Sequence, residues 1–237
     1  LVSGTNLYLG GSFKLINSGF AGSRGAALDL TTGIANQNFP IIDGEVSATI
    51  SDGNGGWFIG GTFTKIGTYK RKNLAQIDSG GNVTAFNPEI SGSVYALSLS
   101  GTTLYVGGNF QYVNGGIKRQ ILAAIDVNTS FATSFNPSLN GIVYSTQISG
   151  TTLYTGGAFT SVNGATGRNY FAAIDMTTGN ATSLNPNCNS FVMTLFVSGN
   201  TLYMGGDFTS LNGGGTLRNH LAAIDITSST ITSFNPN

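Results

Sequence analysis

Short apolar segments separated by turn residues follow one another along the whole chain. In the clearest copy, the apolar segment 94–99 is followed by a second one, Leu104-Tyr-Val-Gly-Gly-Asn-Phe110. A third segment, Ile121-Leu-Ala-Ala-Ile125, and a fourth, Phe131-Ala-Thr-Ser-Phe135, complete the pattern. Short apolar runs with frequent turn signals and no helical periodicity predict an all-β chain.

The second of these segments occurs five times. Its first glycine stands at positions 10, 60, 107, 156 and 205, which gives steps of 50, 47, 49 and 49 residues. Such a period is typical of stacked copies of one supersecondary unit, and four strands per copy form the blade of a β-propeller. We therefore predict one all-β domain over residues 1–237, a β-propeller of five four-stranded antiparallel blades that either closes by itself or belongs to a larger ring. The predicted repeat units are roughly 1–40, 41–88, 89–137, 138–186 and 187–237.

The position of a strand within its blade predicts its burial. We expect the first strand, nearest the central channel, to be buried on both faces and to alternate weakly, and the fourth, outermost strand to be more polar. All five prolines of the chain stand at the end of the predicted fourth strand, where a missing N–H is tolerated. They are Pro40, Pro88, Pro137, Pro186 and Pro236.

The repeat resembles a known family. The order Leu-Tyr-Val-Gly-Gly-x-Phe, Asn-Gly, Arg, Leu-Ala-Ala-Ile-Asp and Thr-x-Phe-Asn-Pro, read from Leu104 to Pro137, is similar to the delta-sixty type of β-propeller repeat. The resemblance covers essentially the whole chain. It implies a bacterial surface protein or a fungal cell-polarity marker of the outer cell surface, and it implies no shared catalytic residues.

The paired glycines need an explanation, because glycine inside a strand costs about 0.5–1 kcal/mol relative to alanine. We expect that the missing Cβ atoms allow a neighbouring blade or the following Phe ring to approach the backbone closely. A phosphate cradle is the functional alternative, but no Gly-rich loop leads into a predicted helix.

Half of the charged residues recur at two repeat positions. Because Asp29 and Asp175 precede Thr-Thr-Gly, we predict an Asx-type turn after the third strand. A guanidinium can bind a carboxylate through two hydrogen bonds, so we hypothesise an Arg–Asp ladder within or between blades. A ring of calcium-binding carboxylates is disfavoured, since one Asp per blade offers too few oxygens, and we expect no metal. The repeated residues are Asp29, Asp78, Asp126, Asp175 and Asp225, with Arg71, Arg119, Arg168 and Arg218, and with Arg24 nearer to its Asp.

A local acidic patch lies in the second repeat. It contains Asp43, Glu45 and the segment Asp52-Gly-Asn-Gly55. This segment fits a hairpin turn, and it also fits part of a calcium loop that lacks its closing Glu. Both interpretations stay open at this point.

Catalytic chemistry has little support. His220 is the only histidine and Cys188 the only cysteine, and neither lies in a nucleophile motif. A glycosidase with paired carboxylates would have to use residues such as Asp52, Glu89 and Asp207. We therefore predict no enzyme and no cofactor, with an extracellular hydrolase as the second alternative function.

The loop between the second and third strands differs most between repeats. In the second repeat it reads Thr68-Tyr-Lys-Arg-Lys-Asn73. Exposed Tyr beside Lys and Arg can bind carbohydrate, an acidic polymer or protein, and a solvated loop without a ligand is the alternative. The candidate ligand-binding residues are Tyr69, Lys70, Arg71, Lys72, Tyr112, Lys118 and Tyr170.

Composition narrows the class of function. Charged residues make up 8% of the chain, against about 25% in typical soluble domains. The 10 basic and 10 acidic residues balance, so we expect no nucleic-acid partner, and no apolar run approaches the roughly 20 residues of a membrane helix. The chain begins within a repeat, so we expect it to be part of a longer protein. We predict a non-catalytic extracellular or cell-surface scaffold for adhesion or protein recognition, with a carbohydrate-binding, lectin-like propeller as the first alternative.

Overall fold

The computed structural model describes residues 2–3, 6–13, 15–16, 20–21, 24–36 and 39–236. Strands account for 48% of the residues and helix for 1%, which confirms the all-β prediction. Within the described ranges, one short 3-10 helix is present, η1 (Asn212–Gly214). The chain forms two compact units, unit 1 with Leu1–Leu104, Phe110–Lys118 and Ile125–Ala132, and unit 2 with Tyr105–Asn109, Arg119–Ala124 and Thr133–Asn237.

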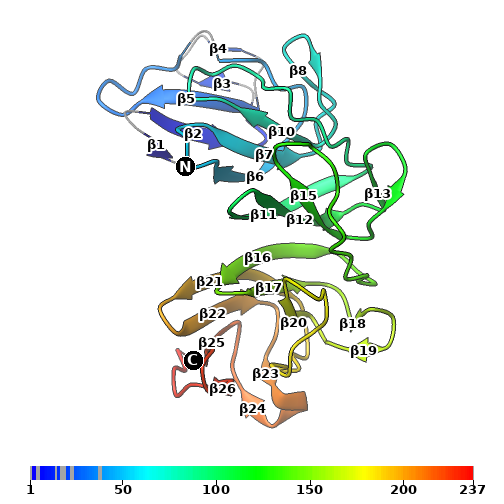
Figure 1. Cartoon of the computed structure of the whole chain (residues 1–237). Helices are drawn as coiled ribbons and strands as arrows, with labels where there is room; N and C mark the ends of the chain where they lie inside the picture. Colours follow the sequence, from blue (N-terminus) through cyan, green and yellow to red (C-terminus); the bar gives the residue numbers. More distant parts are fainter. Residues whose placement is uncertain are drawn as a thin grey trace. The chain divides into compact units, whose positions relative to one another are not determined.

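Every repeat contributes one main sheet and one small hairpin (Figure 1). In hydrogen-bonding order, the main sheets are β1 (Val2–Ser3), β2 (Asn6–Gly10) and β5 (Gly25–Asp29); β6 (Val46–Ser51), β7 (Trp57–Gly61) and β10 (Leu74–Ile77); β11 (Ser93–Ser100), β12 (Thr103–Asn109) and β15 (Leu122–Asp126); β16 (Val143–Ser149), β17 (Thr152–Gly157) and β20 (Phe171–Asp175); and β21 (Val192–Ser198), β22 (Thr201–Gly206), β25 (Leu221–Asp225) and β26 (Thr230–Ile231). The hairpins are β3 (Leu15–Ile16) with β4 (Phe20–Ala21), β8 (Lys65–Ile66) with β9 (Tyr69–Lys70), β13 (Tyr112–Val113) with β14 (Ile117–Lys118), β18 (Ser161–Val162) with β19 (Thr166–Gly167), and β23 (Ser210–Leu211) with β24 (Thr216–Leu217).

The fourth strand is shorter than predicted. It is a strand only in the fifth repeat, as β26, whereas the described part of each other repeat has a single bridge pair there, such as Ile174 with Ala181. The next residue, Thr182, donates its N–H to Ala173, but its carbonyl oxygen accepts a hydrogen bond from Arg168. The fifth repeat has the same contact, from Arg218 to Thr232, directly after the two pairs of β26, so the Arg contact follows the last pair in both repeats and does not set the length of the fourth strand.

The burial of the first strand differs between repeats. Along β11, buried and half-buried residues alternate, with Val94, Ala96 and Ser98 buried. In β21, Met193 and Phe196 are exposed at 47% and 61%. The expectation of two largely buried faces is therefore wrong for β21, whereas β11 has no exposed residue and differs from the prediction only in its regular alternation.

The paired glycines stand where packing leaves no room for a side chain, as predicted. A Cβ on Gly156 would lie 2.6 Å from Cγ1 of Val192 in the next repeat. A Cβ on Gly157 would collide with the carbonyl oxygen of Ile142, in the segment leading into β16 of the same repeat. In two other repeats, a Cβ on the first glycine would also collide with a Val of the next repeat: Gly10 with Val46 and Gly60 with Val94.

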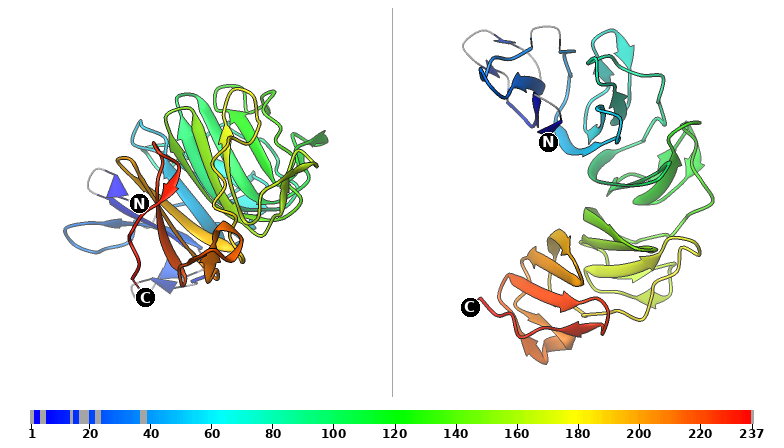
Figure 2. Two further views of the ribbon diagram at one scale, coloured as in Figure 1. Left: turned by 90° about the horizontal axis from the view of Figure 1, so that it is seen from below. Right: turned by 60° about the vertical axis from the view of Figure 1, so that its left-hand side comes forward.

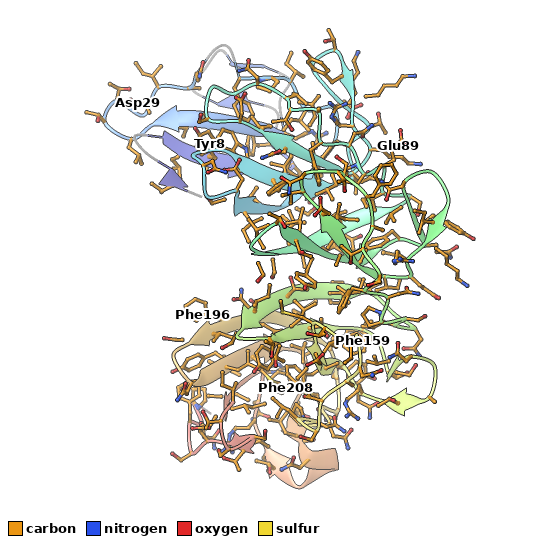
Figure 3. The ribbon with its side chains drawn as sticks, in the orientation of Figure 1. Tyr8, Asp29, Glu89, Phe159, Phe196 and Phe208 are labelled. Atoms are coloured by element: carbon orange, nitrogen blue, oxygen red, sulfur yellow. The ribbon has the colours of Figure 1, made fainter. Side chains whose placement is uncertain are left out.

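Each unit has its own apolar core. In unit 2 the sheets of the fourth and fifth repeats pack face to face, with β16 and β17 against β21 (Figure 2). Phe159 and Phe208, which follow the glycine pairs, are fully buried (Figure 3). In unit 1, Trp57 is buried between Tyr8 and Phe39, with ring centroids 3.5 Å and 6.2 Å away.

Candidate binding site

The repeated Asp closes a turn in its own repeat, which confirms the Asx-type turn. In Asp126, Oδ1 accepts the N–H groups of Asn128 at 3.0 Å and Thr129 at 2.9 Å, and the Thr129 hydroxyl at 3.0 Å. The Thr129 N–H, then its hydroxyl, hold the pKa of the Asp126 carboxyl below its usual value. The equivalent turns lower the pKa of the other four carboxyls in the same direction, at Asp29, Asp78, Asp175 and Asp225.

The repeated Arg holds the outer segment of its repeat. Arg168 donates from Nη2 to the carbonyl oxygen of Thr182 at 2.6 Å and from Nη1 to that of Gly167 at 2.8 Å. Three of the other four make the same contact with a Thr carbonyl oxygen: Arg71 with Thr84 at 2.5 Å, Arg119 with Thr133 at 2.6 Å and Arg218 with Thr232 at 2.8 Å. Arg24 donates to the carbonyl oxygen of Ser12 at 3.0 Å. The expected Arg–Asp pair within a repeat is therefore wrong for Arg168 and Asp175, because each is hydrogen-bonded elsewhere.

The acidic residues of the second repeat also serve the fold. Asp43 accepts the N–H groups of Thr64 at 2.8 Å and Lys65 at 2.9 Å, and the Thr64 hydroxyl at 2.6 Å. Burial acts against ionisation of Asp43, but these hydrogen bonds outweigh it and lower the pKa. In later repeats the same hairpin is held by Ser91, Asn140 and Asn189.

The segment Asp52-Gly-Asn-Gly55 is a turn. Oδ1 of Asp52 accepts the N–H groups of Asn54 at 2.8 Å and Gly56 at 2.9 Å, and Oδ2 accepts the amide of Gln76 at 2.9 Å. Over the described ranges, no three His, Cys, Asp or Glu side chains lie close enough together to hold a metal ion. These contacts support the hairpin interpretation over the calcium loop.

His220 and Cys188 both take part in the hydrogen bonding or packing of the fold. His220 has a φ of 65°, and its Nδ1 lies 3.0 Å from the carbonyl oxygen of Gly206. Cys188 is buried in the core of unit 2, and this burial raises the pKa of its thiol to about 12. A thiol with such a pKa is a poor nucleophile at neutral pH.

The candidate loop residues separate into two groups. Tyr170 lies in unit 2, where its ring packs edge-to-face on Phe191 with centroids 5.4 Å apart. The other six lie on the hairpins β8–β9 and β13–β14 or directly after β9, all in unit 1. Tyr170 is thus a packing residue.

Three cavities lie in series beside these hairpins. The first, of about 390 Å³, is lined by Lys72, Glu89, Ser91 and Tyr112, among others. The second, of about 360 Å³, shares Lys72 and Glu89 with it and adds Lys65 and Lys70. The third, of about 550 Å³, shares Lys65 and is lined by Phe39, Pro40, Ile41 and Asp43. We call these three neighbouring cavities, which share lining residues, the basic groove, lined by Ile41, Asp43, Lys65, Lys70, Lys72, Glu89 and Tyr112.

Hydrogen bonds fix the walls of the basic groove. The segment carrying Glu89 lies between the two hairpins (Figure 3). On one side, the N–H of Ile90 donates to the carbonyl oxygen of Lys72 at 3.2 Å, and on the other, the N–H of Ser91 donates to that of Tyr112 at 2.9 Å. Glu89 itself has a φ of 49°, a left-handed conformation that is uncommon outside glycine.

The sequence pattern predicted some of the residues that line this groove. Lys70, Lys72 and Tyr112 line it, as the loop pattern predicted, while Tyr69 lies beside it with the Arg71 guanidinium 5.6 Å from its ring centroid. Lys118 pairs with Tyr112 across β13–β14 and is not a lining residue of the three cavities.

Lys65, Ile41 and Glu89 were missed as groove residues. For Lys65, the sequence did contain a clue: Lys65, Lys70 and Lys72 are three of the five lysines in the chain and lie close together in sequence. Glu89 was visible as a departure from the repeat, but its distance in sequence from the hairpin concealed the contact.

Comparisons with solved structures identify the architecture. The WD40 domain of Neurospora crassa Pan2 matches with a TM-score of 0.58 and 13% identity, covering 88% of this chain and 58% of that one. The chain has a β-propeller fold. Two computationally designed proteins are also similar: Ika8 with a TM-score of 0.48, 14% identity and coverage of 98% and 87%, and Ika4 with 0.49, 15%, and 81% and 99%.

The propeller chain spans just over half of the Pan2 domain's length. No family model matches its sequence, and no curated protein does. In the part of the chain that is described, no helix is both long and apolar enough to cross a membrane.

Proposed function

We propose that this β-propeller is a non-catalytic recognition scaffold that binds a protein partner in the basic groove. One observation carries the proposal: the repeated Asp and Arg side chains are hydrogen-bonded within the fold, whereas five of the charges that differ between repeats, Asp43, Lys65, Lys70, Lys72 and Glu89, line the groove. Asp126 and Arg119 illustrate the first group, and Lys70 and Lys72 the second. Loops on a rigid scaffold are the usual place for binding residues.

The proposal includes a location outside the cell or on its surface. The low charge content, 8% of residues, supports an exported protein. The resemblance of the segment 104–137 to the delta-sixty repeat supports the same location, because members of that family are surface proteins. Protease treatment of intact source cells tests this point, and a chain protected until the cells are lysed would contradict it.

A variant built from the chain's own repeats tests the binding function. At the positions of Lys65, Tyr69, Lys70 and Lys72, the fourth repeat has Ser161, Thr166, Gly167 and Asn169. The exchange variant therefore carries Lys65→Ser, Tyr69→Thr, Lys70→Gly and Lys72→Asn. These residues already occur at the same places in a repeat of this fold, so we expect the variant to fold.

Both proteins are applied to an array of secreted and cell-surface proteins and to a glycan array. We expect the wild-type chain to bind members of the protein array and the exchange variant to lose those signals. Binding to glycans alone, abolished in the exchange variant, would contradict protein recognition and support the lectin-like alternative. Protein signals that survive in the exchange variant would place the site elsewhere.

A further inference from the structure

We propose that the basic groove selects an extended acidic segment of its partner protein, with an apolar residue of that segment placed against Ile41. This inference rests on the proposed recognition function and specifies its ligand. It follows from the charges along the groove, its length and the change from polar to apolar lining at one end.

The charges favour a ligand with carboxylates. Lys65, Lys70 and Lys72 are exposed on the groove, and the carboxylates beside them are Glu89 and Asp43. The Asp43 carboxylate already accepts three hydrogen bonds from Thr64 and Lys65. The three ammonium groups are therefore available for acidic side chains, while Glu89 can accept an N–H group of the ligand.

The shape favours an extended segment over a compact molecule. The three cavities have volumes of about 390, 360 and 550 Å³, and neighbouring cavities share the lining residues Lys72 and Glu89, or Lys65. A compact ligand would fill one of them, whereas an extended chain can pass along all three. Because the walls are hydrogen-bonded to each other, little ordering cost is expected on binding.

The apolar end favours a peptide over an acidic polysaccharide. Ile41 is 55% exposed and lies with Phe39 and Pro40 at the third cavity. A uniformly charged polysaccharide has no apolar group to place against Ile41. It would also place a negative charge next to the Glu89 carboxylate. A peptide can combine an apolar side chain, carboxylates and an N–H donor.

The test uses the whole chain and fluorescein-labelled octapeptides. The peptides contain Ser and Gly with one Leu and two Asp at every relative spacing, and a matched set has Asn in place of Asp. Binding is followed by fluorescence anisotropy. We expect at least one spacing to bind, its Asn counterpart to bind roughly tenfold more weakly, and higher salt to weaken binding.

Single substitutions locate the ligand. Lys65→Gln and Lys72→Gln should each weaken the best peptide by roughly threefold, and Ile41→Ser, the residue of the fourth repeat at this position, by a similar factor. Lys118→Gln on the neighbouring strand β14 is the matched control and should bind normally. Circular dichroism and the melting temperature confirm that every variant is folded.

Three results would overturn the inference, and they differ in what they say about the proposed function. Binding of Asn peptides as tight as that of Asp peptides, still sensitive to the exchange variant, would remove the acidic selectivity and leave protein recognition intact. Binding of polygalacturonate, with no peptide bound, would contradict both. Equal losses for Lys118→Gln and Lys72→Gln would show that only the general charge of the chain matters.

Discussion

Val192 occupies the space that a side chain on Gly156 would need. The Cγ1 atom of Val192, on the first strand of the fifth repeat, lies 2.6 Å from the position of a Cβ on Gly156. This contact joins two consecutive repeats inside unit 2. It explains why the fourth repeat keeps a glycine in the interior of β17, where glycine is otherwise unfavourable.

Gly156→Ala should therefore destabilise the fold by about 1–3 kcal/mol, because the added methyl group overpacks the contact. Urea unfolding measures the change. Gly167→Ala is the matched control, since a Cβ at Gly167 has no atom within 4 Å, and it should change stability by less than about 0.5 kcal/mol. Val192→Ala combined with Gly156→Ala should cost less than the sum of the two single changes. Equal stability of Gly156→Ala and wild type would refute the steric explanation.

Arg168→Leu should destabilise the fourth repeat by about 1–2 kcal/mol, because the half-buried carbonyl of Thr182 loses its charged donor. Hydrogen exchange should rise first around residues 181–184, which follow β20. In a double-mutant cycle with Asp175→Asn, the coupling should stay within about 0.5 kcal/mol, since the two side chains have separate partners. A larger coupling would restore the Arg–Asp ladder.

Acid should weaken the Asp turns. The folded state lowers the pKa of Asp175, chiefly through the N–H and hydroxyl of Thr178, below its usual 3.8. The contribution is therefore complete above about pH 4 and is lost as the pH falls through the folded pKa. Carboxyl NMR titration should give a pKa below 3.8 for Asp175, and Asp175→Asn should show a shallower loss of stability between pH 4 and pH 2 than the wild type. An NMR pKa at or above the usual value would contradict the turn.

Cys188 should react with thiol reagents only when unit 2 opens. Its side chain is buried, and its pKa of about 12 leaves little thiolate at neutral pH. Labelling by a chromogenic disulfide should be slow in buffer and fast in concentrated guanidinium chloride. Rapid labelling of the native protein would contradict the burial of Cys188.

The periodic part of the structure was predictable because each repeat shows the same residues in the same order. The glycine pair, the buried Phe159 and the turn at Asp126 all follow from comparing copies within one chain. The Arg contacts were not predictable, because Arg168 donates to the backbone carbonyl oxygen of Thr182. Every residue has such an oxygen, so the contact does not restrict which residue type stands at position 182.

The groove was only partly predictable for a related reason. Tyr112 and Lys72 stand out as loop residues that differ between repeats. Their meeting with Glu89 depends on how the connection into the third repeat lies between two hairpins, which no local pattern encodes. The apolar contribution of Ile41 was concealed because isoleucine in a strand-rich chain is expected in the core.

We propose that the residues shared between repeats build this propeller and that the residues differing between repeats give it its binding specificity. The most direct test is an anisotropy titration of the exchange variant with the best acidic octapeptide, beside the wild-type chain. We expect the wild-type chain to bind and the exchange variant, with unchanged unfolding, to bind at least roughly tenfold more weakly. Equal affinity of the two proteins would contradict the claim.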